Sequence, residues 1–563
     1  MRRSIQLSIF FFFCCCAGVS WARVPRHLKA DAVKNLARLP TENKACERFA
    51  PGSIVTEPKN LFSQAGTLTV TLNYESSVNA DGNVEYCYRT PEGQRSPTLH
   101  LKPGETLVLN LINKTPAPSG VEAMAGHMML NKNEACGPGL MMDSSSTNLH
   151  FHGTNVSPTC HQDESLKTLV NSGQSFTYQV HFPKDEPPGL YWYHPHIHGT
   201  SEAALLGGAS GAIIIEGIQQ VQKKTGGLSE RVLVFRDNLI PTNPKPGGLI
   251  PSWDLSLNFI PIPYPKYPPA IIQMKPQSRE LWRVLNASAD TILDLQLSYD
   301  GVPQSLAVVG LDGVPTDSES GQLLGHEILR KHIFLSPAAR AEFIVEAPGK
   351  NITRAELSTL AIDTGPAGDS DPARNLAIIE SRPVAVQPSV VLAKDFHFPS
   401  LPRFKKVLKE KIKTKRKIYF SEVISNPADP SSPTDFFITE DKPAVKPQKF
   451  TMDLPPAIVT TQGQIEEWTV ENRSTESHEF HIHQIHFLLM KRNGIPVDAS
   501  DQQFLDIIEV PYWSGQAKDP YPSVTLRIDF SGDIVGDFVY HCHIIGHEDN
   551  GMMAKIRVLP KKK

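Results

Sequence analysis

The sequence predicts an all-β protein built from three consecutive Greek-key β-sandwich domains. Two observations support this prediction. Short runs rich in β-branched residues alternate with turns of Gly, Pro, Asn and Asp, and no long helical period competes with them. The length of 563 residues is too great for a single hydrophobic core and favours three or four domains.

The predicted strands fall into three blocks. Period-2 runs lie at residues 66–74, 105–115 and 210–217, then at 230–238 and 340–348, and finally at 522–530. We therefore expect domain 1 at residues 50–217, domain 2 at residues 228–385 and domain 3 at residues 445–560.

Residues 386–444 are expected to form a connecting segment. This stretch opens and closes rich in proline and contains the charged run from Arg403 to Lys417. Such a run is typical of a solvated face or a linker, and a docking patch is the alternative.

The N-terminus has the layout of a secretory signal peptide at residues 1–22. Arg2 and Arg3 precede an apolar stretch at residues 9–19, and Ala22 ends a run of residues suited to cleavage. The stretch is too short for a comfortable membrane span, although an uncleaved anchor is the alternative. We expect an exported protein, periplasmic or secreted, without a stable membrane span. The net charge of −3 gives no support for nucleic-acid binding.

Cysteine usage agrees with export. The cysteines at positions 14–16 would be removed with the signal peptide. Apart from Cys542, the cysteines that remain form an even set suited to two disulfides in an oxidising compartment: Cys46, Cys87, Cys136 and Cys160. Three pairings are possible, and four free thiols are the competing interpretation. We favour Cys136 with Cys160, a pair that brackets His150, and Cys46 with Cys87.

Residues 541–552 read His-Cys-His-Ile-Ile-Gly-His-Glu-Asp-Asn-Gly-Met. A Cys thiolate, two imidazoles and a weak axial Met form the ligand set of a blue-copper electron-transfer site. Cys542, His547 and Met552 supply three of these four ligands, so the second imidazole must come from elsewhere. His541 and His543 flank the Cys directly, an adjacency that a second redox metal would exploit.

Paired histidines recur elsewhere in the chain. One H-x-H pair is a weak indication, because alternate residues of any strand share a face and a single strand histidine is usually satisfied by hydrogen bonds. Four such units, one of them enclosing a Cys, favour a metal centre. The other three units are His150 with His152, His194 with His196, and His481 with His483.

The order and spacing of these motifs resemble the multicopper oxidases. Residues 191–199, "YWYHPHIHG", and residues 541–553, "HCHIIGHEDNGMM", are similar to bacterial laccase-like enzymes and copper-efflux oxidases. The resemblance implies cupredoxin domains, with domain 2 as a copper-free spacer and a trinuclear cluster between domains 1 and 3. It also implies four copper ions: a type 1 copper on His478, Cys542, His547 and Met552; a type 2 copper on His150 and His481; and two type 3 coppers, one on His152, His194 and His543 and the other on His196, His483 and His541.

Two acidic residues match positions that resemble the family's proton-supplying carboxylates. Glu548 follows His547, and Asp163 follows the first histidine pair. The alternative is that each is a solvated surface charge. His198 and His486 are expected to lie beside the ligands without binding copper.

The resemblance implies a laccase-like oxidase that takes electrons from small reductants, mainly phenols, and reduces O2 to water. A cuprous oxidase for copper tolerance is the first alternative, and a non-catalytic exported copper-binding protein is an alternative from another class. A loop at residues 120–142 holds five of the eleven methionines, and these thioethers suit either Cu(I) or irregular packing. The sequence leaves the oligomeric state open.

Overall fold

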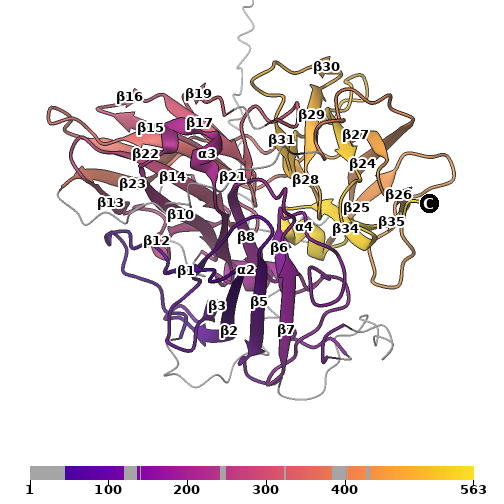
Figure 1. Cartoon of the computed structure of the whole chain (residues 1–563), viewed down its shortest axis with the longest axis horizontal. Coiled ribbons are helices and arrows are strands. Elements are labelled where there is room, and N and C mark those ends of the chain that lie inside the picture. Colours follow the sequence, from indigo (N-terminus) through magenta and orange to yellow (C-terminus); the bar gives the residue numbers. More distant parts are fainter. Residues whose placement is uncertain are drawn as a thin grey trace, which may run out of the picture.

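The computed structural model describes residues 45–118, 136–139, 141–240, 249–322, 325–382, 401, 403–426 and 432–562. Six β-sheets in these ranges pair into three sandwiches around a common centre (Figure 1). The fold is the predicted one, all-β with three consecutive sandwiches. The predicted signal peptide at residues 1–22 lies outside the described residues.

The first sandwich pairs a four-stranded sheet, β3-β2-β5-β7, with a five-stranded sheet, β1-β4-β9-β8-β6. Its strands are β1 (Asn60–Phe62), β2 (Thr67–Val78), β3 (Val84–Arg89), β4 (Thr98–Leu101), β5 (Thr106–Asn113), β6 (His150–His152), β7 (Ser175–His181), β8 (Gly189–His194) and β9 (Gly211–Ile215). The short helix α2 (Ser201–Leu206) joins β8 to β9, and α3 (Ile218–Val221) and η1 (Lys223–Thr225) follow them.

The second sandwich pairs an eight-stranded with a six-stranded sheet. Its strands are β10 (Ser229–Asn238), β11 (Asp254–Leu257), β12 (Ile260–Ile262), β13 (Ala270–Met274), β14 (Arg279–Asn286), β15 (Leu293–Tyr299), β16 (Val302–Pro303), β17 (Leu306–Leu311), β18 (Val314–Pro315), β19 (Ile328–Arg330), β20 (Ile333–Leu335), β21 (Arg340–Glu346), β22 (Ala355–Thr359) and β23 (Arg374–Ser381).

The third sandwich pairs a seven-stranded with a five-stranded sheet. Its elements are β24 (Thr414–Ile424), β25 (Thr434–Glu440), β26 (Ile458–Thr461), β27 (Ile465–Asn472), β28 (His478–Ile482), β29 (Phe487–Arg492), β30 (Ile495–Pro496), β31 (Phe504–Leu505), β32 (Ile507–Val510), β33 (Ser523–Asp529), β34 (Gly536–Cys542), the helix α4 (Ile545–Asp549) and β35 (Met553–Leu559). In Figure 1, α4 and β34 (yellow) lie beside β6 and β8 (purple) at the centre of the molecule.

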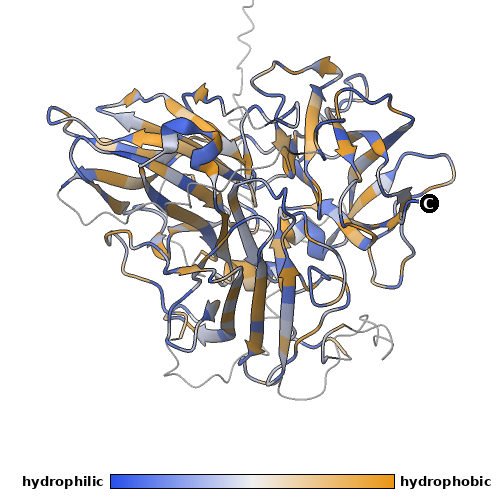
Figure 2. Cartoon of the chain, viewed as in Figure 1, coloured by the Kyte–Doolittle hydropathy of each residue, from blue (hydrophilic) through white to orange (hydrophobic). Residues whose placement is uncertain are grey.

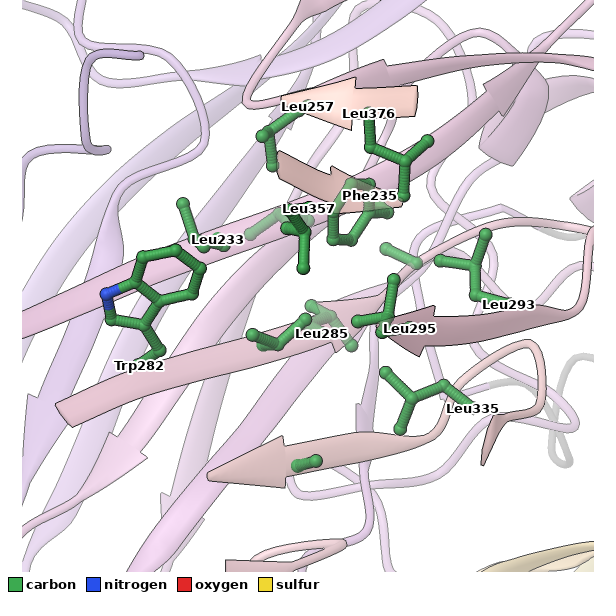
Figure 3. Close-up of a cluster of buried hydrophobic side chains, with 14 of the residues drawn as sticks. Leu233, Phe235, Leu257, Trp282, Leu285, Leu293, Leu295, Leu335, Leu357 and Leu376 are labelled. Carbon is green, nitrogen blue, oxygen red and sulfur yellow. The ribbon is translucent and has the colours of Figure 1, made fainter. Parts of the chain in front are cut away.

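Each sandwich encloses an apolar core, and the core of the second continues into side chains of β8 and β9 of the first. Strand β5 shows the underlying pattern, because its residues alternate strictly between partly exposed and buried. Figure 2 shows hydrophobic residues concentrated on the strands and hydrophilic residues in many of the loops. In the second sandwich, Phe235 of one sheet and Leu295 and Leu357 of the other belong to one buried cluster between the sheets (Figure 3).

The prediction that residues 386–444 form a connection is wrong for β24 and β25. Strand β24 pairs in parallel with β27 and antiparallel with β25, so both strands belong to the third sandwich. The charged run does not have the alternating apolar pattern of a strand, because the outward-facing residues of β24 are lysines. Arg416, on the other face, donates to Glu466 (Nε–Oε2 2.7 Å) and to Glu440. Arg403, at the start of the run, is also buried and pairs with Asp185.

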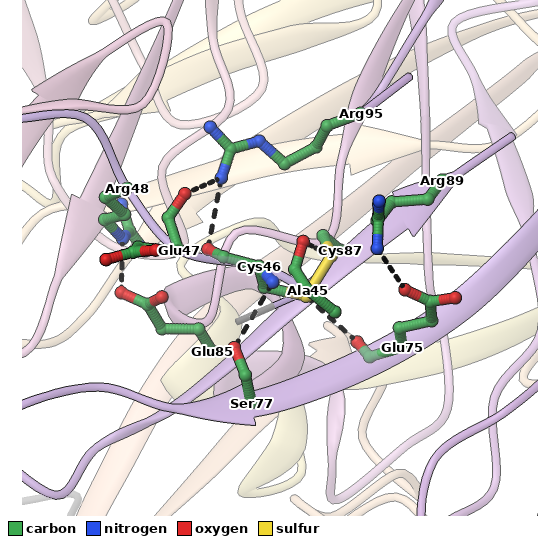
Figure 4. Close-up of a disulfide and its surroundings, with 10 residues drawn as sticks. All are labelled: Ala45, Cys46, Glu47, Arg48, Glu75, Ser77, Glu85, Cys87, Arg89 and Arg95. Carbon is green, nitrogen blue, oxygen red and sulfur yellow. Dashed lines mark hydrogen bonds and ion pairs between the residues drawn. A yellow bond between two sulfur atoms is a disulfide. The ribbon is translucent and has the colours of Figure 1, made fainter. Parts of the chain in front are cut away.

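Both favoured disulfides are confirmed. Cys46–Cys87 links the segment before β1 to β3. Cys136–Cys160 closes a loop of the chain that contains the first histidine pair. Figure 4 shows the first disulfide, with Arg95 hydrogen-bonded to the carbonyl of Cys46. The residues that the structure describes include no helix with both the length and the apolar character that a membrane crossing requires.

Candidate metal centre

Three side chains meet inside the third sandwich and form what we call the Cys542 site. His478 begins β28, Cys542 ends β34 and His547 lies on α4, so two paired strands and a short helix hold them. Cys542 Sγ lies 3.7 Å from the Nδ1 atom of each histidine, and the two Nδ1 atoms are 3.0 Å apart. The three donor atoms form a small triangle, the arrangement that a trigonal His2Cys copper site requires.

Hydrogen bonds fix which nitrogen of His478 faces Cys542. The Ser474 hydroxyl donates to Asn472 Oδ1 and lies 2.6 Å from His478 Nε2, so it accepts the Nε2–H. The Nδ1 lone pair is then free for a metal ion. Burial lowers the pKa of His478 to about 3, so its imidazole is neutral. Burial also raises the pKa of the Cys542 thiol, and a bound cation would favour the thiolate.

Met552 and Met553 differ in the side they face. Met552 is fully buried in the same apolar cluster as Cys542, whereas Met553 packs with Leu166 and Phe450 in another cluster. The main chain of Met552 is tied to the site, because its carbonyl accepts from Cys542 N–H and its N–H donates to the carbonyl of His547. Met552 is therefore the methionine that fits an axial position.

Eight further histidines form a second group, the histidine cluster. They come from β6, from the end of β8, from β28 and from the end of β34: His150, His152, His194, His196, His481, His483, His541 and His543. Donor atoms of His150, His152 and His194 lie within 4.8 Å of one another, as do those of His196, His483 and His541. The ring of His543 lies 4.9 Å from that of His152. The structure thus brings together all ten histidines that the sequence singled out, in two neighbouring groups.

Backbone carbonyls orient several of these rings. His194 Nδ1–H donates to Pro195 O (2.9 Å), His481 to Asp506 O (2.7 Å) and His541 to Cys542 O (2.9 Å). This arrangement leaves Nε2 of His194 and His481 buried without a hydrogen-bond partner in the described structure. Such orphaned nitrogens are unfavourable unless they bind something.

The protonation of the cluster also suits a metal. Burial, followed by the neighbouring imidazoles, lowers the pKa of most of these histidines, that of His194 to about 3. Neutral imidazoles with inward lone pairs are the form that binds copper. The residues present therefore fit copper ions at both sites.

The end of strand β34 supplies residues to both sites. Cys542 is bonded through the main chain to His541 and His543, which face the histidine cluster, while its own side chain faces His478. The His543 N–H donates to the carbonyl of Glu479 (2.8 Å), the residue after His478, and this bond ties the end of β34 to β28.

Glu548 and Asp163 both lie at the histidine cluster and are fully buried. Glu548 Oε2 is 3.1 Å from His541 Nδ1, and Oε1 is 3.5 Å from His196 Nε2. Burial raises the pKa of Glu548, whereas positive charge on His196 and His541 and the hydrogen bond to His541 lower it; the effect of charge is lost when both rings are neutral copper ligands. The alternative that Glu548 is a solvated surface charge is therefore wrong.

Asp163 acts on one ring. Its carboxylate accepts the Nδ1–H of His150 (2.9 Å to Oδ2), the N–H of Phe151 (2.8 Å) and a hydrogen bond from Gln484. Asp163 is thus also no surface charge. Because its acceptors are occupied by three donors, it fixes the ring of His150 with Nε2 pointing inward.

Sequence reasoning missed Asp506, Arg340 and Asp312. Asp506 Oδ1 lies 3.2 Å from His152 Nε2 and 2.7 Å from Arg340 Nη1. Arg340 comes from β21 of the second sandwich, and its main-chain N–H donates to Asp312 Oδ1. No spacing in the sequence indicates this group, because its members are separated by up to 194 residues.

His198 and His486 lie beside the cluster. The ring of His198 packs edge-on against Phe450, and His486 Nε2–H donates to the carbonyl of Asp312 (2.9 Å). Met141 and Met142 are described, the first partly exposed and the second packed with Leu169. The other methionines of the 120–142 loop lie outside the described residues.

Three β-sandwiches with a Cys-His-His site beside an eight-histidine cluster define a copper-binding oxidoreductase of cupredoxin fold. Two models of the multicopper oxidase family match residues 141–220 and 427–562. The chain belongs to the multicopper oxidase family.

Curated relatives agree with this placement. The "Multicopper oxidase mco" of Staphylococcus aureus is 22% identical, over 86% of this chain and 85% of the relative. The "Laccase" of Bacillus subtilis (strain 168) is 24% identical, over 73% of this chain and 79% of the relative. Among solved structures, a multicopper oxidase from Campylobacter jejuni, described as a metallo-oxidase, is similar in fold, with a TM-score of 0.62 and 22% identity over 92% of this chain and 97% of that one.

Proposed function

We propose that this protein is a laccase-like oxidase with four copper ions, which couples four one-electron oxidations of a small reductant to the reduction of O2. When bound, copper supplies the redox chemistry: O2, four protons and four electrons give two molecules of water. The observation that carries the proposal is the position of Cys542, whose side chain belongs to one site while both sequence neighbours belong to the other.

The proposed ligands follow the two sites. His478, Cys542 and His547, with Met552 in the axial position, would hold the type 1 copper. His150 and His481 would hold the type 2 copper. The remaining six histidines would hold the type 3 pair: His152, His194 and His543 for one copper, and His196, His483 and His541 for the other.

The carboxylates have separate proposed roles. Glu548 Oε2, 3.1 Å from His541 Nδ1, holds and passes on protons that oxygen reduction consumes. Asp163 positions His150, because its two oxygens already accept hydrogen bonds from three donors. Both residues are buried, so water reaches neither of them directly.

Small aromatic reductants, mainly phenols, are the proposed substrate class. The second candidate is a metal cation such as Cu(I), and one observation favours it. Glu476 Oε1 lies 3.5 Å from His547 Nε2, at the imidazole edge away from Cys542. A carboxylate there attracts a cation and disfavours an anionic phenolate.

The test has two parts. A fully loaded preparation should contain four coppers per chain, show an intense thiolate-to-copper absorption, and lose that absorption on Cys542→Ser with the type 2 signal retained. A count of one or two coppers would contradict the trinuclear assignment. Steady-state oxygen uptake with Cu(I), a methoxyphenol and bilirubin then identifies the reductant, and uptake with Cu(I) alone would refute the phenol assignment.

We also propose export with cleavage after residue 22, and domain limits of 50–217 and 228–385 with a third domain extended to start near β24. The two disulfides support an oxidising compartment. N-terminal sequencing of the exported protein tests the cleavage site, and limited proteolysis tests the domain limits.

A further inference from the structure

A cavity of about 290 Å³ lies between the second and third sandwiches, and we call it the interface cavity. Aliphatic side chains supply most of its apolar lining, and polar and charged side chains also contribute to its walls. One wall is formed by strands β17, β19 and β20 of the second sandwich and the other by β29 and β32 of the third. The aliphatic lining includes Val308, Leu311, Ile328, Leu335, Leu489 and Ile508.

The inner end of the interface cavity adjoins the histidine cluster. Ile507 lines the cavity and is the cross-strand partner of His481. Arg340, which also lines the cavity, donates to Asp506, whose carboxylate lies 3.2 Å from His152 Nε2. A single layer of side chains therefore separates the cavity from two proposed copper ligands.

We propose that the interface cavity is the binding and entry site for dioxygen on its way to the histidine cluster. This inference rests on the proposed oxidase function and adds the route of its gaseous substrate. O2 is small, neutral and apolar, so aliphatic walls bind it without desolvation cost, as engineered apolar cavities bind xenon. Arg330 and Asp501, which line the cavity, pair with each other. Arg492 also lines it and donates to the main-chain carbonyl of Glu509.

The position of the cavity distinguishes O2 from the reductant. Electrons enter at the Cys542 site, where the edge of His547 lies on α4 beside Glu476. The interface cavity instead ends at Ile507 and Arg340. Ile507 pairs with His481, and Arg340 contacts Asp506 beside His152, so one layer of side chains separates the cavity from the proposed oxygen-reducing group. Filling the cavity should therefore slow one half-reaction and leave the other unchanged.

Strand β19 offers a matched pair of variants. Ile328 points into the cavity with 8% of its surface exposed, whereas its neighbour Leu329 points outward with 60% exposed. Ile328→Phe adds bulk inside the cavity, and Leu329→Phe adds a ring on the same edge strand outside it. Ala339 also lines the cavity, so Ala339→Leu fills it from a different residue, should Ile328→Phe fail to fold.

The fully copper-loaded enzyme is reduced without oxygen and then mixed with O2 in a stopped-flow instrument. Return of the thiolate-to-copper absorption should slow about tenfold in Ile328→Phe, equivalent to ~1.4 kcal/mol of added barrier, and should be unchanged in Leu329→Phe. Anaerobic reduction should proceed at the parent rate in both. Reoxidation at the parent rate in the folded Ile328→Phe and Ala339→Leu variants would overturn the proposal.

Xenon binding gives a readout that needs no turnover. Crystals of the parent protein pressurised with xenon should show xenon in the interface cavity, and Ile328→Phe crystals should not. Ordered water without xenon in the parent would refute an O2 site. If the copper-loaded parent protein consumes no oxygen, the proposed oxidase function is wrong. If the parent does consume oxygen and the cavity variants reoxidise at the parent rate, only the proposed route for O2 is wrong.

Discussion

Replacing Asp163 with Asn tests how the histidine cluster is held. Asp163 accepts from three donors, namely His150 Nδ1–H at 2.9 Å, Phe151 N–H at 2.8 Å and Gln484. An amide of the same shape has one acceptor oxygen and adds an NH2 group that needs an acceptor. At least one buried donor loses its partner, which costs about 1–3 kcal/mol.

We expect that cost to appear mainly as weaker binding of the type 2 copper. A freed His150 ring no longer holds Nε2 inward, and losing an orienting partner typically lowers metal affinity about 10–100-fold. That range equals about 1.4–2.7 kcal/mol and agrees with the cost of the lost hydrogen bonds. The Cys542 site shares no residue with this contact, so its absorption should be unchanged.

Copper titration against a competing chelator, with the type 2 signal followed by electron paramagnetic resonance, measures the effect. Glu164→Gln is the matched control, because Glu164 is the adjacent carboxylate but accepts from Lys167 N–H and Thr168. Parent-like type 2 affinity in Asp163→Asn would refute the positioning role. Full copper occupancy combined with slow reoxidation would instead assign Asp163 to proton supply.

Three further outcomes are expected. Glu548→Gln should keep four coppers and normal anaerobic reduction but slow reoxidation by O2 about 10²-fold, since an amide cannot carry a proton; reoxidation at the parent rate would make Glu548 a bystander. Met552→Leu should raise the potential of the type 1 copper in a redox titration by removing a weak donor to Cu(II), whereas Met553→Leu should not; the reverse would move the axial ligand by one residue. Burial lowers the pKa of His486 to about 4, from about 6.5 when unfolded, so the unfolded chain binds the extra proton between these values. The unfolding free energy of the metal-free protein should therefore fall as pH drops below 6.5, and His486→Asn should reduce that slope by up to about 1.4 kcal/mol per pH unit in urea titrations; an unchanged slope would contradict the buried neutral imidazole.

The sequence predicted the site residues best where they lie close together along the chain. The pairs on β6 and β28 and the run around Cys542 could be read because strand alternation places such residues on one face. The disulfide Cys136–Cys160 could be anticipated because it closes a loop around one histidine pair. Strand β24 was not predicted, because its exposed lysines alternate with Arg416 and give the segment the appearance of a charged linker. The charge of Arg416 is neutralised by Glu466 and Glu440 on other strands.

Contacts that span domains could not be predicted from one sequence. Asp506, Arg340 and Asp312 have no motif, and each residue taken alone has the character of a surface charge. Only the packing of the second sandwich against the other two buries them together. The role of Glu476 could not be predicted for the same reason, because its carboxylate lies beside His547 only through the position that α4 gives to His547.

The second sandwich is therefore more than a copper-free spacer. Arg340 donates to Asp506 and, through its Nε, to the carbonyl of Leu190 on β8, so one side chain contacts both sandwiches that supply the histidines. Leaving Asp506 buried without this partner would cost several kcal/mol, because its charge would be uncompensated beside His152. Since His481 also depends on the carbonyl of Asp506, the geometry of the histidine cluster is set by a residue of the sandwich that supplies none of its histidines.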